Sequence, residues 1–491
     1  MCEARLPAGS LFRLLATEGG KIFSDEFFAD LYGRRGRPSI PPRIVATVMV
    51  LQRLEGLSDR EAVERFEFDV RWKYAAGDLD VNFPGFTHPV LVEMRARLRA
   101  SKRPDRIFEA TVEMARERGL VGKKRVLDST ALYDAVATQD TVTLVRSAIR
   151  ALLRAASPPN AARIRNVLRR DDTYETAGKP ACEWDDREAR EALVDALAKD
   201  AHAALESLRE VLLSEEEKRA VALVATVVGQ DIEETEQGFR ILKGVAPDRV
   251  ISTVDPEARH GHKTEARGFD GYKGHVAVDP DSEIITATVV TAGNVGDGSV
   301  AEDLLHEDLS TEGRIDEVYG DASYGTADLV EKLENAGIEA NVKVQAPSAR
   351  EGMYSQDAFK IDTSARTATC PAGKLVQLRL QKSGSLRGSF GVACNSCPLR
   401  PQCTESISTT GRVLFLHPKH DVLARSRARQ KTEKWKRGYR ATRPKIERKI
   451  AHLMRRKHGG RRARVRGRER VGQDFALLSG AVNLARMARM A

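Results

Sequence analysis

The stretch KKRVLDSTAL (123–132) decides the fold class, because it is typical of a short apolar strand that ends in a carboxylate, Asp128. A second stretch, EVYGDASYG (317–325), runs in the same way into Asp321. After it, ADLVEKLENA (327–336) has a helical pattern, and IEANVKV (338–344) resumes as a strand. Strands that alternate with a helix predict an α/β core, whose chemistry usually lies at the carboxyl ends of its strands.

A hairpin completes the predicted sheet. Apolar alternation in YKGHVAVD (272–279) and EIITATVV (283–290), with Pro280-Asp281-Ser282 between them, indicates two antiparallel strands joined by a turn.

Helical patterns surround this core. In residues 1–120, Ser58 and Glu61 form a capping box, and His88–Arg99 is an arginine-rich helical segment. Two helices joined by a turn fit a helix-turn-helix reader of DNA, and they fit an ordinary helical bundle with a basic rim equally well. Residues 140–245 are again helical, so a long helical stretch interrupts the core after its first strand.

Composition excludes several classes of protein. The 491 residues are 41% hydrophobic and 31% charged, which argues against global disorder. Neither Ile44–Leu51 nor Ala220–Val228, the longest near-apolar stretches, approaches the roughly 18–20 residues of a membrane span. No secretory signal is evident, and six cysteines are too few for a disulfide-built scaffold. We therefore expect a protein of several domains inside the cell.

Positive charge is concentrated near one end. Residues 411–470 hold 23 Lys and Arg against four acids, although the whole chain carries only +10. Such a cluster predicts contact with nucleic acid, because each cation that neutralises a phosphate releases counterions. The alternative is a solubilising segment, or a basic face that pairs with the acidic remainder of the chain.

The two aspartates at strand ends point to metal chemistry only if they converge in space. Carboxylates that meet there repel one another unless a cation lies between them, and Mg²⁺ or Mn²⁺ prefers such oxygen ligands. A third carboxylate, Glu447, lies in the basic segment, where we expect Thr442 or Arg443 to cap a helix with Pro444 in its first turn. An isolated Glu among so many cations is otherwise a salt-bridge partner.

Four cysteines fall within 34 residues: Cys370, Cys394, Cys397 and Cys403. They suggest a structural Zn²⁺ site, although the spacing is not that of two standard knuckles. The alternative is a set of free thiols that pack a small insert.

Other polar residues are weaker candidates. The histidines near the hairpin lack a convincing zinc-hydrolase partner and are expected to face DNA or the core: His260, His262 and His275. Asp297 is either a helix cap or a residue that supports the site, and Lys273 is either a DNA contact or a solvated strand lysine.

Taken in order, several motifs resemble the DDE-type transposases of bacterial insertion sequences, in a branch with a helical insert and a cysteine-bearing segment. The motifs are VLDST (126–130), DPEARHGHK (255–263), GYKGHVAVD (271–279), AGNVGD (292–297), YGDASYG (319–325), Tyr439…Arg443-x-x-x-Glu447 and LLSGAVNLARMAR (477–489). This resemblance implies a ribonuclease H-like mixed-sheet core. It also implies that Asp128, Asp321 and Glu447 bind two Mg²⁺ or Mn²⁺ ions, which activate a water or a 3′-hydroxyl for in-line attack at phosphorus.

The family signature near the Glu is Tyr, two residues, Arg, three residues, Glu, six residues, Lys. Arg443 and Glu447 fit it, Tyr439 is one residue too far, and Met454 stands at the Lys position with Arg455 and Lys457 just beyond. The expected DNA contacts are therefore these: Arg443, Tyr439, Arg455, Lys457 and Lys273.

The predicted organisation has six parts. They are a helical DNA-binding domain (1–120), the first part of the catalytic core (121–139), a helical insertion (140–245), the second part of the core (246–345), a Cys-rich insertion (346–425) and a basic C-terminal part of the core (426–491).

We expect a transposase that binds the inverted-repeat ends of its element, cleaves DNA and joins the freed 3′ ends to a target. Its expected partners are double-stranded DNA and a second copy of the chain, in the cytoplasm at the bacterial nucleoid. Two rivals remain: a ribonuclease H-like nuclease without strand transfer, and a non-catalytic DNA-binding relic.

Overall fold

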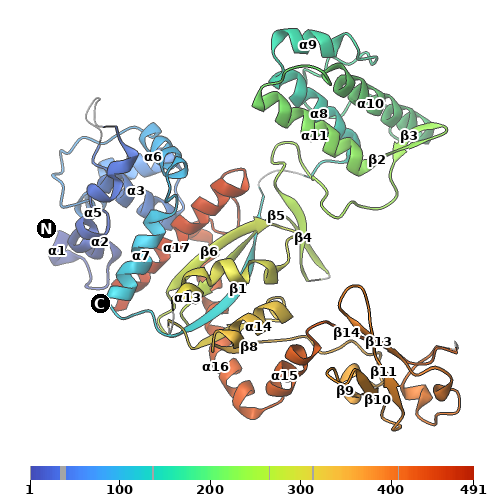
Figure 1. Cartoon of the computed structure of the whole chain (residues 1–491). Coiled ribbons are helices and arrows are strands. Elements are labelled where there is room, and N and C mark those ends of the chain that lie inside the picture. Colours follow the sequence, from blue (N-terminus) through green and yellow to red (C-terminus); the bar gives the residue numbers. More distant parts are fainter. Residues whose placement is uncertain are drawn as a thin grey trace.

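The computed structural model describes residues 2–33, 40–134, 138–264, 266–311, 314–406 and 409–490. A mixed α/β core lies at the centre, with helices on one side and two further lobes on the other (Figure 1). None of the described helices combines the length and the apolar character that crossing a membrane needs.

The central sheet has six strands: β1 (Lys124–Tyr133), β4 (Arg259–Thr264), β5 (Arg267–Val278), β6 (Ile285–Ala292), β7 (Glu317–Gly320) and β8 (Glu339–Val342). Its order is β4-β5-β1-β7-β8, with β6 paired to β5. β1 is antiparallel to β5 and parallel to β7, and β7 is parallel to β8. The mixed sheet and the β5–β6 hairpin confirm the expectations from sequence.

The first strand is longer than predicted. We expected it to end at Asp128, but β1 continues to Tyr133 because its second half pairs residue by residue with β5, from Asp128–Val276 to Tyr133–Gly271. Asp128 therefore lies within the strand, whereas Asp321 directly follows β7, as predicted.

Three helices accompany the parallel strands: α12 (Ala301–Leu304), α13 (His306–Ser310) and α14 (Ala327–Asn335). As the sequence predicted, Thr326 caps α14, and its side chain accepts a hydrogen bond from the amide of Leu329.

The long connection between β1 and β4 folds around a hydrophobic core of its own. It contains α8 (Thr141–Ala155), α9 (Pro158–Arg165), α10 (Arg187–Ser207), α11 (Glu215–Asp231) and a hairpin of β2 (Ile232–Thr235) and β3 (Gly238–Ile241). The hairpin was not predicted, because its two strands have only four residues each.

The cysteine-bearing segment forms two small antiparallel sheets over a separate core. Their strands are β9 (Lys360–Asp362), β10 (Thr367–Thr369), β11 (Leu375–Gln377), β12 (Arg379–Leu380), β13 (Leu386–Ser389) and β14 (Val413–Leu416).

The N-terminal part is helical, and the predicted capping box of Ser58 and Glu61 opens α4. The helices are α1 (Cys2–Arg5), α2 (Leu11–Ile22), α3 (Pro42–Glu55), α4 (Asp59–Phe68), α5 (Val70–Ala75), α6 (Pro89–Ala100) and α7 (Arg106–Glu117). The C-terminal part consists of α15 (His420–Gln430), α16 (Glu433–Leu453) and α17 (Arg468–Met490).

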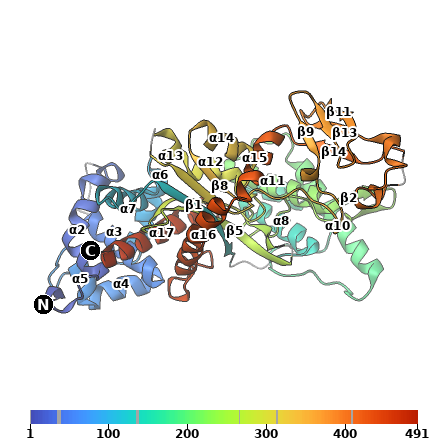
Figure 2. The ribbon, with the colours of Figure 1, turned by 90° about the horizontal axis from the view of Figure 1, so that it is seen from below.

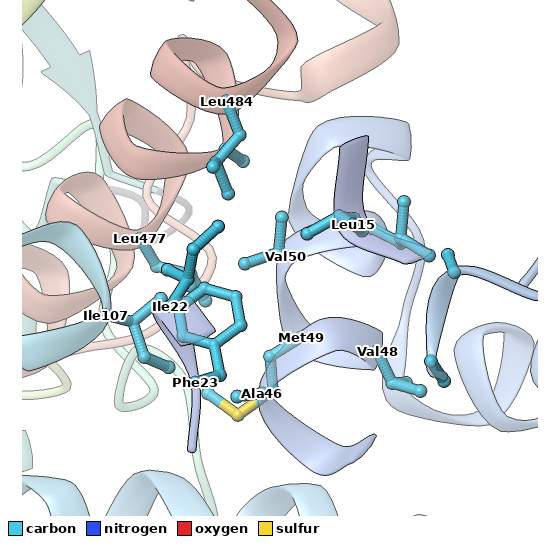
Figure 3. Close-up of a cluster of buried hydrophobic side chains, with 14 of the residues drawn as sticks. Leu15, Ile22, Phe23, Ala46, Val48, Met49, Val50, Ile107, Leu477 and Leu484 are labelled. Atoms are coloured by element: carbon cyan, nitrogen blue, oxygen red, sulfur yellow. The ribbon is translucent and has the colours of Figure 1, made fainter. Parts of the chain in front are cut away.

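α17 joins the N-terminal helices to the sheet (Figures 1 and 2). Leu477 and Leu484 enter the core of the N-terminal helices, as Figure 3 shows, while Phe475 and Leu478 belong to the core beneath the sheet. Phe475 packs so closely on β5 that a Cβ at Gly274 would lie 2.8 Å from its ring.

A buried asparagine fixes α17 on the sheet. Asn483 is fully buried; its Oδ1 accepts from the amide of Ile285 at 2.9 Å, and its Nδ2 donates to the Ile285 carbonyl at 2.8 Å. The side chain thus satisfies both backbone groups of one β6 residue.

We expect Asn483→Ala to lower the free energy of unfolding by about 2–4 kcal/mol, since each buried group left unpaired costs about 1–3 kcal/mol. Urea denaturation followed by circular dichroism measures this change. Arg489→Ala, an exposed position on the same helix, is the control. An equal loss in both variants would contradict the role given to Asn483.

Candidate active site

Two parallel strands bring the predicted aspartates to the same level. Val126 of β1 pairs with Tyr319 of β7, so two further residues along each strand lead to Asp128 and Asp321. Neighbouring strands lie about 4.7–4.9 Å apart, which places the two carboxylates side by side at the edge where β7 ends.

A single guanidinium connects these carboxylates. Nη1 of Arg443 lies 2.9 Å from Oδ2 of Asp128, and its Nη2 lies 3.7 Å from Oδ2 of Asp321. Only 12% of the Arg443 side chain is exposed, against 13% for Asp128 and 37% for Asp321. The arginine therefore supplies the cation that two adjacent carboxylates require.

α16 positions this arginine across the sheet. One turn before it, the Tyr439 hydroxyl donates to the Gly320 carbonyl at 3.3 Å, and the Tyr439 ring stacks on Trp435 at 4.6 Å. The helix is thus held directly over the end of β7.

The surroundings of Asp128 act on its charge in opposite directions. Burial raises the pKa of Asp128, and the nearby Asp321 adds to this, while Arg443 and the Ser129 amide lower it. The Ser129 amide donates to Oδ1 of Asp128 at 2.8 Å. A further cation near this pair would favour the ionised form.

A second polar group lies behind the aspartates. Asp297 accepts from the Ser129 hydroxyl at 2.6 Å and binds the Lys273 ammonium at 2.9 Å. Lys273 also donates to the Val295 carbonyl at 2.9 Å. Gly296 rather than Asp297 is the N-cap of the short helix that begins here, and the Asp297 carboxylate supports Ser129, the neighbour of Asp128. Lys273 as a DNA contact stays a prediction, and its ammonium is already paired here.

His275 and Tyr324 form a buried pair beside this group. Nδ1 of His275 lies 3.0 Å from the Tyr324 hydroxyl, and its Nε2 lies 2.9 Å from Oγ1 of Thr291. Burial lowers the pKa of His275 to about 4, so the ring is neutral at pH 7. The structure places His275 in the core; His260, in contrast, pairs with Asp270 at the exposed β4–β5 ribbon.

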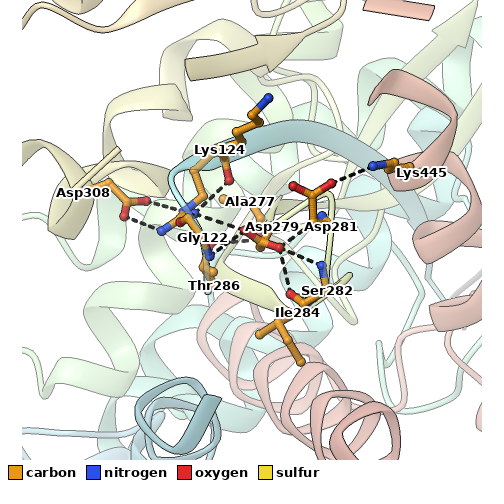
Figure 4. Close-up of polar contacts among 11 residues, drawn as sticks. Gly122, Lys124, Ala277, Asp279, Asp281, Ser282, Ile284, Thr286, Asp308 and Lys445 are labelled. Atoms are coloured by element: carbon orange, nitrogen blue, oxygen red, sulfur yellow. Dashed lines mark hydrogen bonds and ion pairs between the residues drawn. The ribbon is translucent and has the colours of Figure 1, made fainter. Parts of the chain in front are cut away.

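A buried ion-pair network holds the start of β1 and the hairpin turn together (Figure 4). Arg125 donates to both carboxylate oxygens of Asp308 at 2.8 and 2.9 Å, and Asp279 accepts from the Gly122 amide at 2.9 Å. Lys445 of α16 reaches Asp281 in the same turn at 2.7 Å. These contacts fix β1, and thereby Asp128, relative to α16.

The third predicted carboxylate is not part of this cluster. Glu447 is exposed and lies one helical turn, about 6 Å along the axis, beyond Arg443. Among the described residues, no three His, Cys, Asp or Glu side chains are arranged to hold a metal ion. The structure thus unites Asp128 and Asp321, while the place of Glu447 in the triad stays a prediction.

The helix that carries Glu447 begins earlier than expected. We predicted a cap at Thr442 or Arg443, but Thr432 caps α16, and Pro444 lies in the helix interior. An interior proline costs about 3 kcal/mol. Packing against the sheet, through Ile446 and Leu453, offsets that cost, and local sequence does not reveal it.

The residues at the family's Lys position divide into two kinds. Met454 is buried in the core, whereas Arg455 and Lys457 are exposed. Their contact with DNA stays a prediction.

The four cysteines of the predicted zinc site line one cavity of about 20 Å³. Amides of Lys374 and Arg412 approach the sulfur atoms of Cys370 and Cys394 at 3.3 and 3.4 Å. The thiols form no disulfide, and among the described residues they are not arranged to hold a metal ion. The alternative of packing thiols fits this arrangement, and bound zinc stays a prediction.

No pattern in the sequence singled out Lys449. It is fully buried in α16, its Nζ has no hydrogen-bond partner, and burial lowers its pKa to about 7. Glu283, Arg486 and Arg489 contribute smaller electrostatic effects.

We expect Lys449→Met to stabilise the protein by about 2–4 kcal/mol at pH 6, since one pKa unit corresponds to about 1.4 kcal/mol. Between the folded pKa and the higher unfolded one, the unfolded chain binds more protons, so wild-type stability rises with pH. The gain should therefore shrink from pH 7 to pH 10. Urea denaturation across this range measures it, with exposed Lys434→Met as control; a gain independent of pH would contradict the assignment.

Comparison with known proteins gave two family matches. A transposase DDE domain matches residues 369–488, and a transposase domain of the DUF772 type matches residues 2–97. No curated protein and no solved structure gave a significant match.

The DDE match contains Arg443 and Glu447, whereas Asp128 and Asp321 lie outside both matches. The convergence of the two aspartates in the structure is therefore an observation independent of the family matches. A DDE domain implies a ribonuclease H-like core, with which the mixed sheet is consistent. Together, the two matches support an insertion-sequence transposase of the DDE type.

Proposed function

We propose that this protein cleaves DNA at the ends of its element and transfers the freed 3′ ends to a target, with Asp128, Asp321 and Glu447 as metal ligands. One observation carries the proposal: two carboxylates from adjacent strands, level with one another, share a single cation.

The donor set fits a hard divalent ion. Carboxylate oxygens are the preferred ligands of Mg²⁺ and Mn²⁺, and the Arg443 contacts indicate that positive charge is favourable between them. Glu447 would complete the set if α16 turned toward the strands. Bound ions would supply activation of a water or 3′-hydroxyl and stabilisation of the leaving oxygen.

Residues of the chain itself would position the DNA. In the described structure, none of the nine Lys and Arg residues between 455 and 470 forms an ion pair with a carboxylate. Apart from Arg464, which donates to the Leu57 carbonyl, these cations are available to bind backbone phosphates next to α16, which carries Arg443. Arg443 would then contact the phosphate nearest the aspartates.

The N-terminal helices would recognise the element ends, and two copies of the chain would hold two ends together. A nuclease without strand transfer would use the same carboxylates, so the products of the reaction separate the two functions. A DNA-binding relic would give no products at all.

The test uses purified wild type and Asp321→Asn on DNA that carries the sequences flanking the gene, with Mg²⁺, Mn²⁺ or chelator. We expect metal-dependent 3′ nicks and joined products, reduced by about 10³-fold in Asp321→Asn, because a metal ion supplies several kcal/mol of charge stabilisation.

Asp316→Asn is the matched control, since Asp316 is an exposed aspartate that immediately precedes β7. It should leave the products unchanged. Nicks without joining would favour the nuclease, and binding without any product would favour the relic.

Arg443 and a metal ion should compete for the same carboxylates. We therefore expect Arg443→Gln to bind Mn²⁺ about tenfold more tightly in the absence of DNA, since one charge contact of about 1.4 kcal/mol corresponds to that factor. Titration calorimetry measures the affinity, with exposed Arg440→Gln on the same helix as control. Unchanged or weaker Mn²⁺ binding would contradict the competition.

A further inference from the structure

A cavity of about 240 Å³ lies where the N-terminal helices meet the basic C-terminal segment. Its wall combines α3, α6 and the start of α7 with α17 and the loop that precedes it. Residues more than 400 positions apart in the sequence, such as Met49 and Leu477, thus build one pocket.

The cavity is lined by arginines that are not fully compensated. Arg99 donates to Gln473 at 3.1 Å rather than to a carboxylate, and burial together with the charge of Arg470 lowers its pKa. Arg470 is exposed and, within the described residues, has no carboxylate in ion-pair distance. Two carboxylates of the lining are already paired, Asp59 with Arg95 and Asp474 with Arg53, and Glu469 offsets part of the charge near Arg99. In the part of the chain that the structure describes, Arg99 and Arg470 have no ion-pair partner of their own and favour an anion at this place.

Part of the wall of the cavity is apolar. Met49, Ile107 and Leu477 line it, and Figure 3 shows them converging from three helices. The face of an aromatic ring can pack against this part of the wall without loss of hydrogen bonds.

One carboxyl group in the cavity, that of Asp105, has a buried oxygen without a hydrogen bond. Oδ1 of Asp105 is buried and lacks a hydrogen-bond partner, and burial raises the pKa of Asp105 to about 6. Asp105 stands at the N-cap of α7, yet its side chain makes no capping bond. A buried polar atom without a partner is costly, so the group is suited to a ligand that donates a hydrogen bond.

We propose that this cavity takes one nucleotide of the bound DNA, with its base turned out of the helix. The phosphate would lie at Arg99 and Arg470, the ring against the apolar wall, and an amino group of adenine, cytosine or guanine would donate to Asp105. The inference rests on the proposed function, because it requires that the protein binds DNA.

The test places 2-aminopurine at successive positions of the end DNA, because this base carries an amino group and fluoresces more strongly when unstacked. Binding is measured in chelator, so that no cleavage occurs. For the wild type, we expect one position to brighten.

Asp105→Leu should abolish this signal and weaken end binding about tenfold, since one base contact contributes about 1–3 kcal/mol. Its melting temperature should not fall, because the carboxylate has no partner to lose. Asp105→Asn, which keeps the shape, should reduce the signal as well. Asp185→Leu, an exposed site in the helical insertion, is the control.

The outcomes separate the two proposals. If end DNA binds and no position brightens, or if both Asp105 variants respond like the wild type, the nucleotide pocket is overturned while the transposase function stands. If the wild type does not prefer end DNA to random DNA, end recognition fails, and the pocket fails with it.

Discussion

The packing of α17 is the constraint on which the rest of the structure depends. One face of this helix completes the core of the N-terminal helices, and another completes the core beneath the sheet. Asn483 satisfies a β6 residue, and Arg53 of α3 reaches Asp474 at 2.9 Å. The N-terminal helices are therefore fixed on the catalytic core rather than tethered to it. DNA held by these helices would lie at a set distance from Asp128 and Asp321.

Sequence patterns predicted the elements whose causes are local. Alternation and turn residues predicted the β5–β6 hairpin, and a capping box predicted the start of α4. The features that were predicted wrongly depend on residues distant in the sequence. β1 extends beyond Asp128 because β5 pairs with it, and α16 starts at Glu433 because its packing on the sheet tolerates Pro444. Likewise, no pattern could show that Arg443 bridges two aspartates, one of them 315 residues away.

The bridge has a consequence for how metal and DNA would act together. The Arg443 guanidinium cannot keep its ion pairs with both carboxylates and also bind a DNA phosphate. A phosphate that attracts it would expose the aspartates to a metal ion, and a metal ion there would release it toward the phosphate. By thermodynamic linkage, the factor by which bound DNA raises the affinity for metal equals the factor by which bound metal raises the affinity for DNA. On this proposal, the site would load metal best when DNA is present, which would limit cleavage at other places.

The basic segment, residues 411–470, has two parts that differ in how many of their cations form ion pairs. Lysines and arginines up to Arg448 are largely engaged inside the molecule: Lys419 binds Asp328, Arg425 binds Glu334, and Lys445 binds Asp281. These pairs hold α15 on α14 and α16 on the β5–β6 turn, and their charges are already neutralised. The cations of residues 455–470 have no such partners among the described residues, and this stretch lies between Glu447 and the cavity that contains Asp105. A simple count of charge over 411–470 therefore overstates the DNA footprint, because most of the cations before Lys449 are already paired with carboxylates. The unpaired cations of 455–470 connect the proposed site of cleavage to the proposed site of base recognition.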